Sequence, residues 1–142
     1  MNDEVFVDTA YFVALLDPRD AKRLMALVMA EEFERKRTPL LTSDAVMIEL
    51  GNYFSRSPNK AVVADFISWV RSRPSWQVIP LTPALLARAE ARYRQFADKN
   101  WSLTDCVSME VMVERRMIQI ATTDRGFEQA SFVVLMTDHP AP

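Results

Sequence analysis

The stretch EVFVDTAYFVALLD, residues 4–17, places one carboxylate at the junction of two apolar segments. Residues 5–7 form the first apolar run, Asp8 follows directly, and a second run begins at Tyr11. The first run predicts a buried strand, and residues 9–16 predict a short helix that ends before Pro18. An ionised carboxylate buried without a partner costs several kcal/mol, so we expect Asp8 to have a specific role.

Short apolar strands and longer segments of helical period alternate along the rest of the chain. The predicted strands cover residues 5–7, 39–41, 76–81, 118–123 and 131–136, and the predicted helices cover residues 9–16, 21–36, 43–54, 59–72, 82–97 and 102–117. This alternation is typical of the α/β class, in which crossover helices join parallel strands. In open parallel sheets the functional site lies at the carboxyl ends of the strands, where Asp8 is expected.

Two of the predicted helices carry specific expectations about their buried faces. For residues 21–36 we expect Asp20 as the N-cap and a core-facing set of Leu24, Leu27, Val28, Met29 and Phe33. For residues 59–72 the expected apolar face consists of Val62, Phe66, Ile67 and Val70.

Composition indicates a single domain over residues 1–142 and excludes several classes of protein. With 142 residues, 49% of them hydrophobic, the chain can bury one core. A net charge of −2 gives no global attraction to nucleic acid or to an anionic membrane. The single Cys106 excludes an internal disulfide and a multi-cysteine zinc site, and two glycines exclude a glycine-rich phosphate loop. Without a signal peptide or a membrane span, we expect a soluble cytoplasmic protein.

Three further carboxylates lie in apolar surroundings at places comparable to that of Asp8. Asp124 follows the strand-like run IQIATT, Asp105 is in the first turn of the helix that Ser102 opens, and Glu49 lies inside AVMIELGNYF. Asn52 and Tyr53 share the Glu49 side of that helix by their i+3 and i+4 spacing. Two of the four acids therefore end strands, and two lie in helices that flank strand ends.

Each acid also has a purely structural explanation. Asp105 suits a capping box with Ser102, and Asp124 suits a turn before Gly126. Glu49 suits a polar position on a half-exposed helix, and Asp8 suits an Asx-type cap. If the four converge, however, their like charges raise one another's pKa unless a cation compensates. An all-oxygen cluster selects Mg²⁺ or Mn²⁺ over zinc, and such an ion activates water and polarises phosphoryl oxygens.

The same residues carry a resemblance to a known family. The segments FVDTAYFVALLDPRD, SDAVMIEL, SLTDCVSME and ATTDRGF resemble, in order and approximate spacing, those of PIN-domain proteins and among them the VapC-type toxin ribonucleases. The resemblance covers essentially the whole chain. Asp8, Glu49, Asp105 and Asp124 match the acidic quartet of that family, and Thr122 matches a small hydroxyl residue that helps to position a ligand or a phosphate. Where many relatives carry a further acidic or histidine residue, this chain has Arg125 and Gly126.

The resemblance implies a fold, an activity and partners. The fold would be a three-layer α/β/α sandwich with a central, mainly parallel sheet of four or five strands. The activity would be endoribonuclease cleavage dependent on Mg²⁺ or Mn²⁺, leaving 3′-hydroxyl and 5′-phosphate ends. The implied partners are the RNA substrate, a cognate antitoxin protein and a second copy of the chain in a homodimer.

Two alternatives accompany this hypothesis. The first is a PIN-like module that binds RNA or a protein without cutting. The second is a phosphoaspartate phosphatase, which is disfavoured because Ala10 stands where that mechanism needs a second aspartate. Among the other residues, clusters such as Arg88–Arg92–Arg94 suit either RNA phosphates or a solvated surface, and His139 suits a surface tail.

Overall fold

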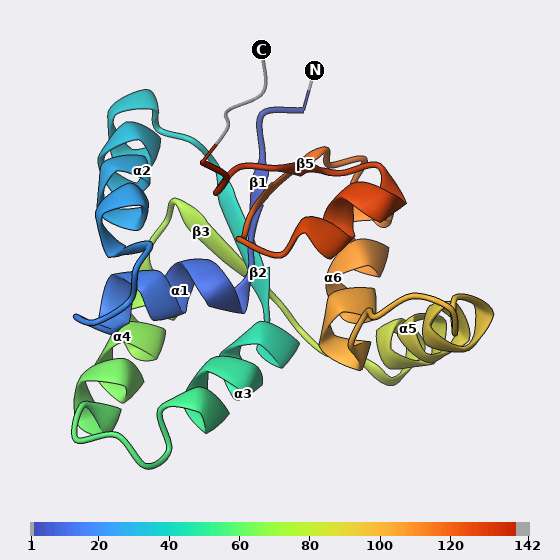
Figure 1. Ribbon diagram of the computed structural model, residues 1–142, viewed down its shortest axis with the longest axis horizontal. Coiled ribbons are helices and arrows are strands. Elements are labelled where there is room, and N and C mark those ends of the chain that lie inside the picture. Colours follow the sequence, from blue (N-terminus) through green and yellow to red (C-terminus); the bar gives the residue numbers. More distant parts are fainter. Residues whose placement is uncertain (1, 139–142) are drawn as a thin grey trace.

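The computed structural model describes residues 2–138, and its centre is a sheet of five parallel strands. In chain order the strands are β1 (Val5–Val7), β2 (Leu40–Ser43), β3 (Trp76–Ile79), β4 (Gln119–Ala121) and β5 (Val133–Val134). Their spatial order is β3-β2-β1-β4-β5, so the first strand is the central one (Figure 1). Val5 pairs in register with Leu40 on one side and with Gln119 on the other. The predicted α/β class with a parallel sheet is confirmed.

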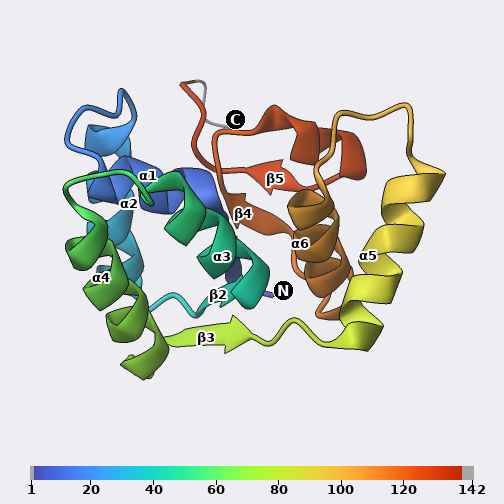
Figure 2. The same ribbon diagram turned by 90° about the horizontal axis from the view of Figure 1, so that it is seen from below.

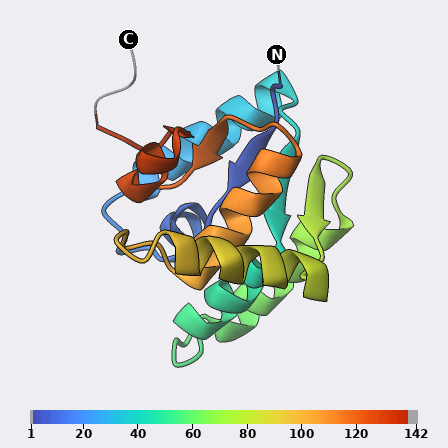
Figure 3. The same ribbon diagram turned by 90° about the vertical axis from the view of Figure 1, so that its right-hand side faces the viewer.

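Helices cover both faces of this sheet and one of its ends. Their bounds are α1 (Thr9–Leu16), α2 (Arg23–Lys36), α3 (Asp44–Tyr53), α4 (Lys60–Ser72), α5 (Pro83–Gln95), α6 (Leu103–Glu114) and the 3₁₀ helix η1 (Arg125–Ala130). Figure 2 shows α1, α2 and α4 on one side of the sheet, α6 and then α5 on the other, and α3 across the carboxyl ends of the strands. Seen from the side, α5 packs along the outside of α6 (Figure 3). This is the expected three-layer α/β/α sandwich.

Local capping explains where several helices begin. Ser43 Oγ accepts the Val46 N–H at 3.2 Å, and Thr82 Oγ1 accepts the Leu85 N–H at 3.1 Å. Each of these bonds satisfies one backbone donor that has no partner inside its helix. Pro83 at the first position of α5 adds a preset backbone angle where no N–H is needed. Local sequence therefore determines these starts.

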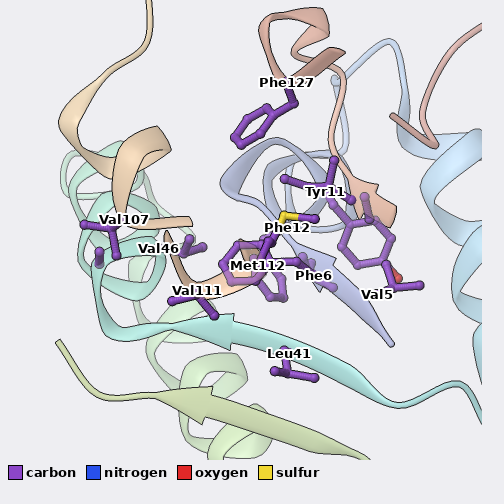
Figure 4. Close-up of a cluster of buried hydrophobic side chains, with 14 of the residues drawn as sticks. Val5, Phe6, Tyr11, Phe12, Leu41, Val46, Val107, Val111, Met112 and Phe127 are labelled. Carbon is purple, nitrogen blue, oxygen red and sulfur yellow. The ribbon is translucent and has the colours of Figure 1, made fainter. Parts of the chain in front are cut away.

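The core surrounds β1, whose three residues are all buried. Figure 4 shows Phe6 of β1 among side chains from α1, α3 and α6, including Phe12, Val46 and Met112. Phe12 lies 5.7 Å from the Phe66 ring centroid in an edge contact, which joins α1 to α4. A central parallel strand covered on both faces must be apolar on both, and this explains the unbroken run VFV.

The structure corrects the expectations for two helices. α2 begins at Arg23 and its N-cap is Lys22, while the Asp20 side chain instead accepts the Lys22 N–H at 2.8 Å. Leu24, Leu27 and Val28 are exposed, because α2 packs through Ala26, Met29 and Phe33. In α4, Val62 is exposed and the neighbouring Val63 is buried instead, while Val70 is buried as expected. Both helices carry apolar residues on more than one face, so periodicity alone did not identify the packed side.

None of the helices within residues 2–138 is long and apolar enough to cross a membrane.

Candidate active site

The four acids identified in the sequence line one pocket at the carboxyl edge of the sheet. The pocket has a volume of about 470 Å³, and its walls include Asp8, Glu49, Asp105 and Asp124. We call it the acidic pocket. Asp8 follows β1 directly and Asp124 lies three residues beyond β4, and these neighbouring parallel strands end at the same edge. α3 brings Glu49 from one side and the first turn of α6 brings Asp105 from the other (Figure 2).

Asp8 is the most buried of the four, with 5% of its surface exposed. Its Oδ2 accepts a hydrogen bond from the Thr122 hydroxyl at 2.8 Å, whereas its buried Oδ1 has no hydrogen-bond partner of standard geometry among residues 2–138. Burial raises the pKa of Asp8 from 3.8 to about 7, the Thr122 hydrogen bond opposes this rise, and the charges of Asp105 and Glu49 add to it. Asp8 occupies the N-cap position of α1, where its side chain makes no cap hydrogen bond of standard geometry, although the Thr9 backbone N–H also lowers its pKa.

Thr122 connects the first of the four acids to the last. Its side chain is fully buried, its hydroxyl donates to Asp8 Oδ2, and its Oγ1 accepts the Asp124 backbone N–H at 3.1 Å. A hydroxyl has one donor and two acceptor positions, so it can hold both groups at once. Thr122 therefore fixes the Asp8 carboxylate relative to the loop that carries Asp124.

Asp105 combines a structural role with its place in the pocket. Its Oδ2 accepts the Ser102 N–H at 2.9 Å while Ser102 Oγ accepts the Asp105 N–H at 2.9 Å, which completes the expected capping box. Burial nevertheless raises the pKa of Asp105 from 3.8 to about 6; the hydrogen bonds from Ser102 lower it, and the charges of Asp124 and Glu49 raise it further. The cap orients this carboxylate but does not compensate its charge.

The remaining two acids are more accessible. Asp124 is exposed, and its Oδ1 accepts the Gly126 N–H at 2.8 Å, as its interpretation as a turn residue predicted. A side chain at Gly126 would be built 2.9 Å from that oxygen, so glycine suits this close approach. Glu49 is half-buried, and its charge acts on both Asp8 and Asp105. Both residues line the acidic pocket.

Other pocket residues did not stand out in the sequence. Asp20 lines the pocket as a fifth acid, and Lys22 lines it while its Nζ forms an ion pair with Asp138 Oδ1 at 2.7 Å. Thr9, which directly follows Asp8, is buried, and its hydroxyl has no hydrogen-bond partner within the described residues; no sequence pattern marked this position. Tyr53 also lines the pocket, as its i+4 spacing from Glu49 allowed. The loop between α1 and α2 brings Asp20 and Lys22 here, and the sequence contains no signal of that approach.

The donor set suits a hard divalent cation, although the side chains do not form a closed coordination shell. Within residues 2–138, no group of three or more Asp, Glu, His or Cys side chains has an arrangement that could hold a metal ion. Two observations nevertheless fit such an ion: the buried Asp8 Oδ1 lacks a hydrogen-bond partner of standard geometry among residues 2–138, and the charges of neighbouring acids raise the pKa values of both Asp8 and Asp105. Carboxylate oxygens are the ligands that Mg²⁺ and Mn²⁺ prefer.

The other candidate residues have structural roles. Arg92 Nε contacts Glu110 Oε2 at 2.6 Å and Arg88 contacts Glu114 at 3.1 Å, so this basic cluster joins α5 to α6. Cys106 is a buried free cysteine, as expected of a small apolar side chain. Trp101 is buried and donates its Nε1–H to the Gly126 carbonyl at 3.0 Å. His139 lies outside the described residues.

A known protein family and several solved structures are similar to this chain. The family model of the PIN domain matches residues 5–133. The crystal structure of Mycobacterium tuberculosis VapC20, described as a sarcin–ricin loop cleaving toxin, superposes with a TM-score of 0.78 at 23% identity, covering 91% of this chain and 96% of that one.

Two further structures share the fold at lower similarity. FitAcB from Neisseria gonorrhoeae has a TM-score of 0.60 at 17% identity, with coverage of 92% of this chain and 95% of that chain. VapBC2 from Rickettsia felis, bound to a DNA fragment from its promoter, has a TM-score of 0.65 at 13% identity, with coverage of 92% and 96%. No curated protein sequence matches the chain significantly.

Proposed function

The chain belongs to the PIN-domain family, and from that membership we propose that it is a metal-dependent endoribonuclease hydrolysing phosphodiester bonds of cytoplasmic RNA. One observation carries the proposal: Asp8 is buried at the carboxyl edge of the sheet with one oxygen unpartnered, in a pocket that Glu49, Asp105 and Asp124 also line. The mutual repulsion of acids gathered in this way destabilises the protein unless a bound cation compensates their charge. Use in binding a cation explains why the chain keeps them.

Asp8, Glu49, Asp105 and Asp124 would hold the ion, Mg²⁺ or Mn²⁺. When bound, such an ion lowers the pKa of water and polarises a phosphoryl oxygen. Thr122 would keep the Asp8 carboxylate in position through its 2.8 Å hydrogen bond, and the Ser102 cap would do the same for Asp105. The exposed Asp124 and the half-buried Glu49 would complete the negative surface on the solvent side.

A second candidate function is a PIN-like module that binds RNA or protein without cutting. The observation that favours it is the absence, within the described part of the chain, of three side chains arranged to hold a metal. The two functions differ in their need for a cation. A nuclease requires Mg²⁺ or Mn²⁺ to bind the acidic pocket, whereas a binding module does not, so a Mn²⁺ titration separates them.

We further propose that the chain is the toxin of a toxin–antitoxin pair and forms a homodimer. The similar structures of VapC20, a toxin by its description, and of VapBC2 support this assignment. Exposed apolar side chains give such partners a surface to bind, among them Leu24 at 75% exposure and Val28 at 55% on α2. Co-purification with the product of an adjacent reading frame, and the mass in solution, test the two interactions.

The nuclease proposal is tested with a labelled RNA oligonucleotide and the purified chain. We expect cleavage with Mg²⁺ or Mn²⁺, none with a chelator, and products with 3′-hydroxyl and 5′-phosphate ends. Asp105→Asn should abolish cleavage. The matched control is Asp44→Asn, because Asp44 also lies in the first turn of a helix but pairs with Arg71 at 2.7 Å outside the pocket. Full activity of Asp105→Asn, or cleavage in the chelator, would contradict the proposal.

A further inference from the structure

We propose that the RNA strand leaves the acidic pocket across Tyr53 and enters a second pocket, where Arg19 and Arg56 bind its phosphates. This inference rests on the proposed ribonuclease function and adds the path of the substrate. The second pocket has a volume of about 640 Å³ and lies between the loop that follows α1 and the loop that follows α3. We call it the arginine pocket.

The two pockets are adjacent, because one residue lines both of them. Tyr53 lines both the acidic pocket and the arginine pocket. It is the last residue of α3, the helix that carries Glu49, and the arginine pocket extends from it over Phe54 and Arg56. A strand whose scissile phosphate lies among the acids therefore reaches the arginine pocket by crossing one side chain.

The charges of the two pockets are opposite. Arg19 and Arg56 are exposed, and neither guanidinium has a hydrogen bond or an ion pair among residues 2–138. Asp17 also lines this pocket, where its Oδ1 accepts the Arg19 backbone N–H at 3.0 Å. By contrast, Arg71, Arg88 and Arg92 all form ion pairs within the protein. Guanidinium groups without a protein partner are available to phosphates, which they bind in bidentate geometry.

Tyr53 supplies an aromatic surface at the boundary. Its side chain is 58% exposed, while the neighbouring Phe54 is 4% exposed and anchored in the core. The two rings meet edge to face, with centroids 4.9 Å apart, so Phe54 supports the Tyr53 ring and leaves much of it accessible. Unpaired bases of single-stranded RNA stack on such rings.

The loops that carry the two arginines are ordered by local hydrogen bonds. The Ser57 N–H donates to the Phe54 carbonyl at 3.0 Å, and Ser57 Oγ accepts the Asn59 N–H at 3.0 Å. Pro18 and Pro58 further restrict the two segments. Binding on a preordered surface loses less conformational entropy. An aromatic ring between an acidic centre and two free guanidiniums fits a nucleic acid strand better than an acidic protein segment, which offers no bases for Tyr53.

Binding is measured separately from cleavage. The probe is a fluorescein-labelled single-stranded RNA oligonucleotide, followed by anisotropy in a chelator so that it stays intact. Arg19→Ala and Arg56→Ala should each weaken affinity by about 3- to 10-fold and reduce the slope of log Kd against log salt by about 0.7. Tyr53→Ala should weaken it by about 5- to 100-fold, and Tyr53→Phe should leave it within about 2-fold of the wild type.

Arg94→Ala is the matched control, because Arg94 is an exposed arginine on α5 without an ion pair among the described residues. It should leave both the affinity and the salt slope unchanged. With Mg²⁺ or Mn²⁺ present, the Arg19→Ala/Arg56→Ala double variant should raise KM more than it lowers kcat. Circular dichroism melting checks that each variant is folded.

The outcomes separate this inference from the function on which it rests. If the double variant binds RNA with the affinity and salt slope of the wild type, the arginine pocket is not on the substrate path, even if the protein cleaves RNA. If only binding to a protein partner is lost in the double variant, the inference is equally overturned. If the wild type binds RNA through these residues but never cleaves it, the nuclease proposal fails and the binding path stands.

Discussion

Two groups of carboxylates in this protein have opposite surroundings. In the acidic pocket, Asp8 is buried with one oxygen unpartnered, and its neighbours Asp105 and Glu49 repel it. Farther along α6 from Asp105, Glu110 is also largely withdrawn from solvent, with 17% of its side chain exposed, but Arg92 contacts it at 2.6 Å. Arg88 lies 3.9 Å from the same carboxylate and 3.1 Å from Glu114.

The contrast shows which charges stabilise the fold and which destabilise it. Burial costs a carboxylate part of its hydration energy, and an ion pair with arginine offsets part of that cost. Glu110 therefore stabilises the packing of α5 on α6. Asp8 recovers less of its hydration energy, from the Thr122 hydroxyl and the Thr9 backbone N–H. A protein under selection for stability alone would replace such a residue, so its presence points to a function.

The largest expected effect is that of Asp8→Asn. Cleavage should fall by at least about 100-fold, because the variant lacks the buried charge that would hold the ion. The metal-free protein should become more stable above pH 7. The pKa of Asp8 is raised from 3.8 to about 7 in the folded state, and each pKa unit corresponds to about 1.4 kcal/mol. The free energy of unfolding of the variant should therefore rise by on the order of 4 kcal/mol at most. Urea unfolding at pH 8 measures it.

The same shift determines how stability depends on pH. Between about pH 4 and pH 7 the folded state binds more protons than the unfolded state, so the stability of the metal-free wild type should fall as pH rises through this window. Asp8→Asn should flatten that dependence. Equal slopes for the two proteins would show that the Asp8 carboxylate is paired or hydrated in solution, and the contrast with Glu110 would fail.

The second expected effect is stabilisation by a cation. Mn²⁺ at about 100 times its Kd should raise the free energy of unfolding by about 2.7 kcal/mol, because the ion binds only the folded acidic pocket. Thermal melting with and without Mn²⁺ measures the shift. Asp105→Asn should reduce it strongly, whereas Glu110→Gln should retain it. A shift that is equal in all three proteins would indicate binding elsewhere on the surface.

The third effect concerns the hydrogen bond that the Thr122 hydroxyl donates to the Asp8 carboxylate. Thr122→Val should lower stability at pH 8 by about 1–3 kcal/mol, because the ionised and buried carboxylate then loses its hydrogen bond from the Thr122 hydroxyl. It should also raise the pKa of Asp8, since the Thr122 hydrogen bond lowers that pKa, and move the acidic limb of the activity profile to higher pH. Thr122→Ser keeps the hydroxyl and is the control. An unchanged pH profile in Thr122→Val would remove Thr122 from the site.

The smallest effect reverses the sign of the first. Glu110→Gln keeps the shape of the side chain but replaces the ion pair with a hydrogen bond from the charged Arg92 to an uncharged amide oxygen. Stability should therefore fall by about 1 kcal/mol. RNA cleavage should stay at the wild-type level, because Glu110 does not line the acidic pocket. Urea unfolding and the cleavage assay check the two statements. A gain in stability would place Glu110 with Asp8 as an uncompensated charge.

Features with a local cause could be predicted from the sequence. The run VFV marks a strand buried on both faces, Pro18 lies just beyond the end of α1, and Ser43, Thr82 and Ser102 open helices through hydrogen bonds that span three residues. The Asp105 capping box belongs to the same class. Parallel order follows from the alternation of strands and helices, and it brings Asp8 and the Asp124 loop to one edge.

Features that depend on distant segments could not be predicted. Leu24 and Val28 fit the period of a buried face, but tertiary packing chose another face of α2. Asp20 and Lys22 line the acidic pocket because the loop after α1 folds back over it, and the pairing of Arg88 and Arg92 with α6 depends on how two helices pack. Sequence periodicity indicates that one face of a helix is apolar, but it does not indicate whether other elements pack against that face.

By itself, the sequence determined the succession of strands and helices along the chain, the caps formed by Ser43, Thr82 and Ser102, and the set of four acids near the strand ends, because these depend on neighbouring residues and on the geometry of parallel strands. Only the tertiary structure decided which charges are compensated. Thr122 reaches Asp8 across 114 positions of the chain, whereas no arginine pairs with Asp8 in the part of the chain that the structure describes, and Arg92 reaches Glu110 instead. The energy of a charge depends on the partners and the solvent within a few ångströms, and folding alone determines these.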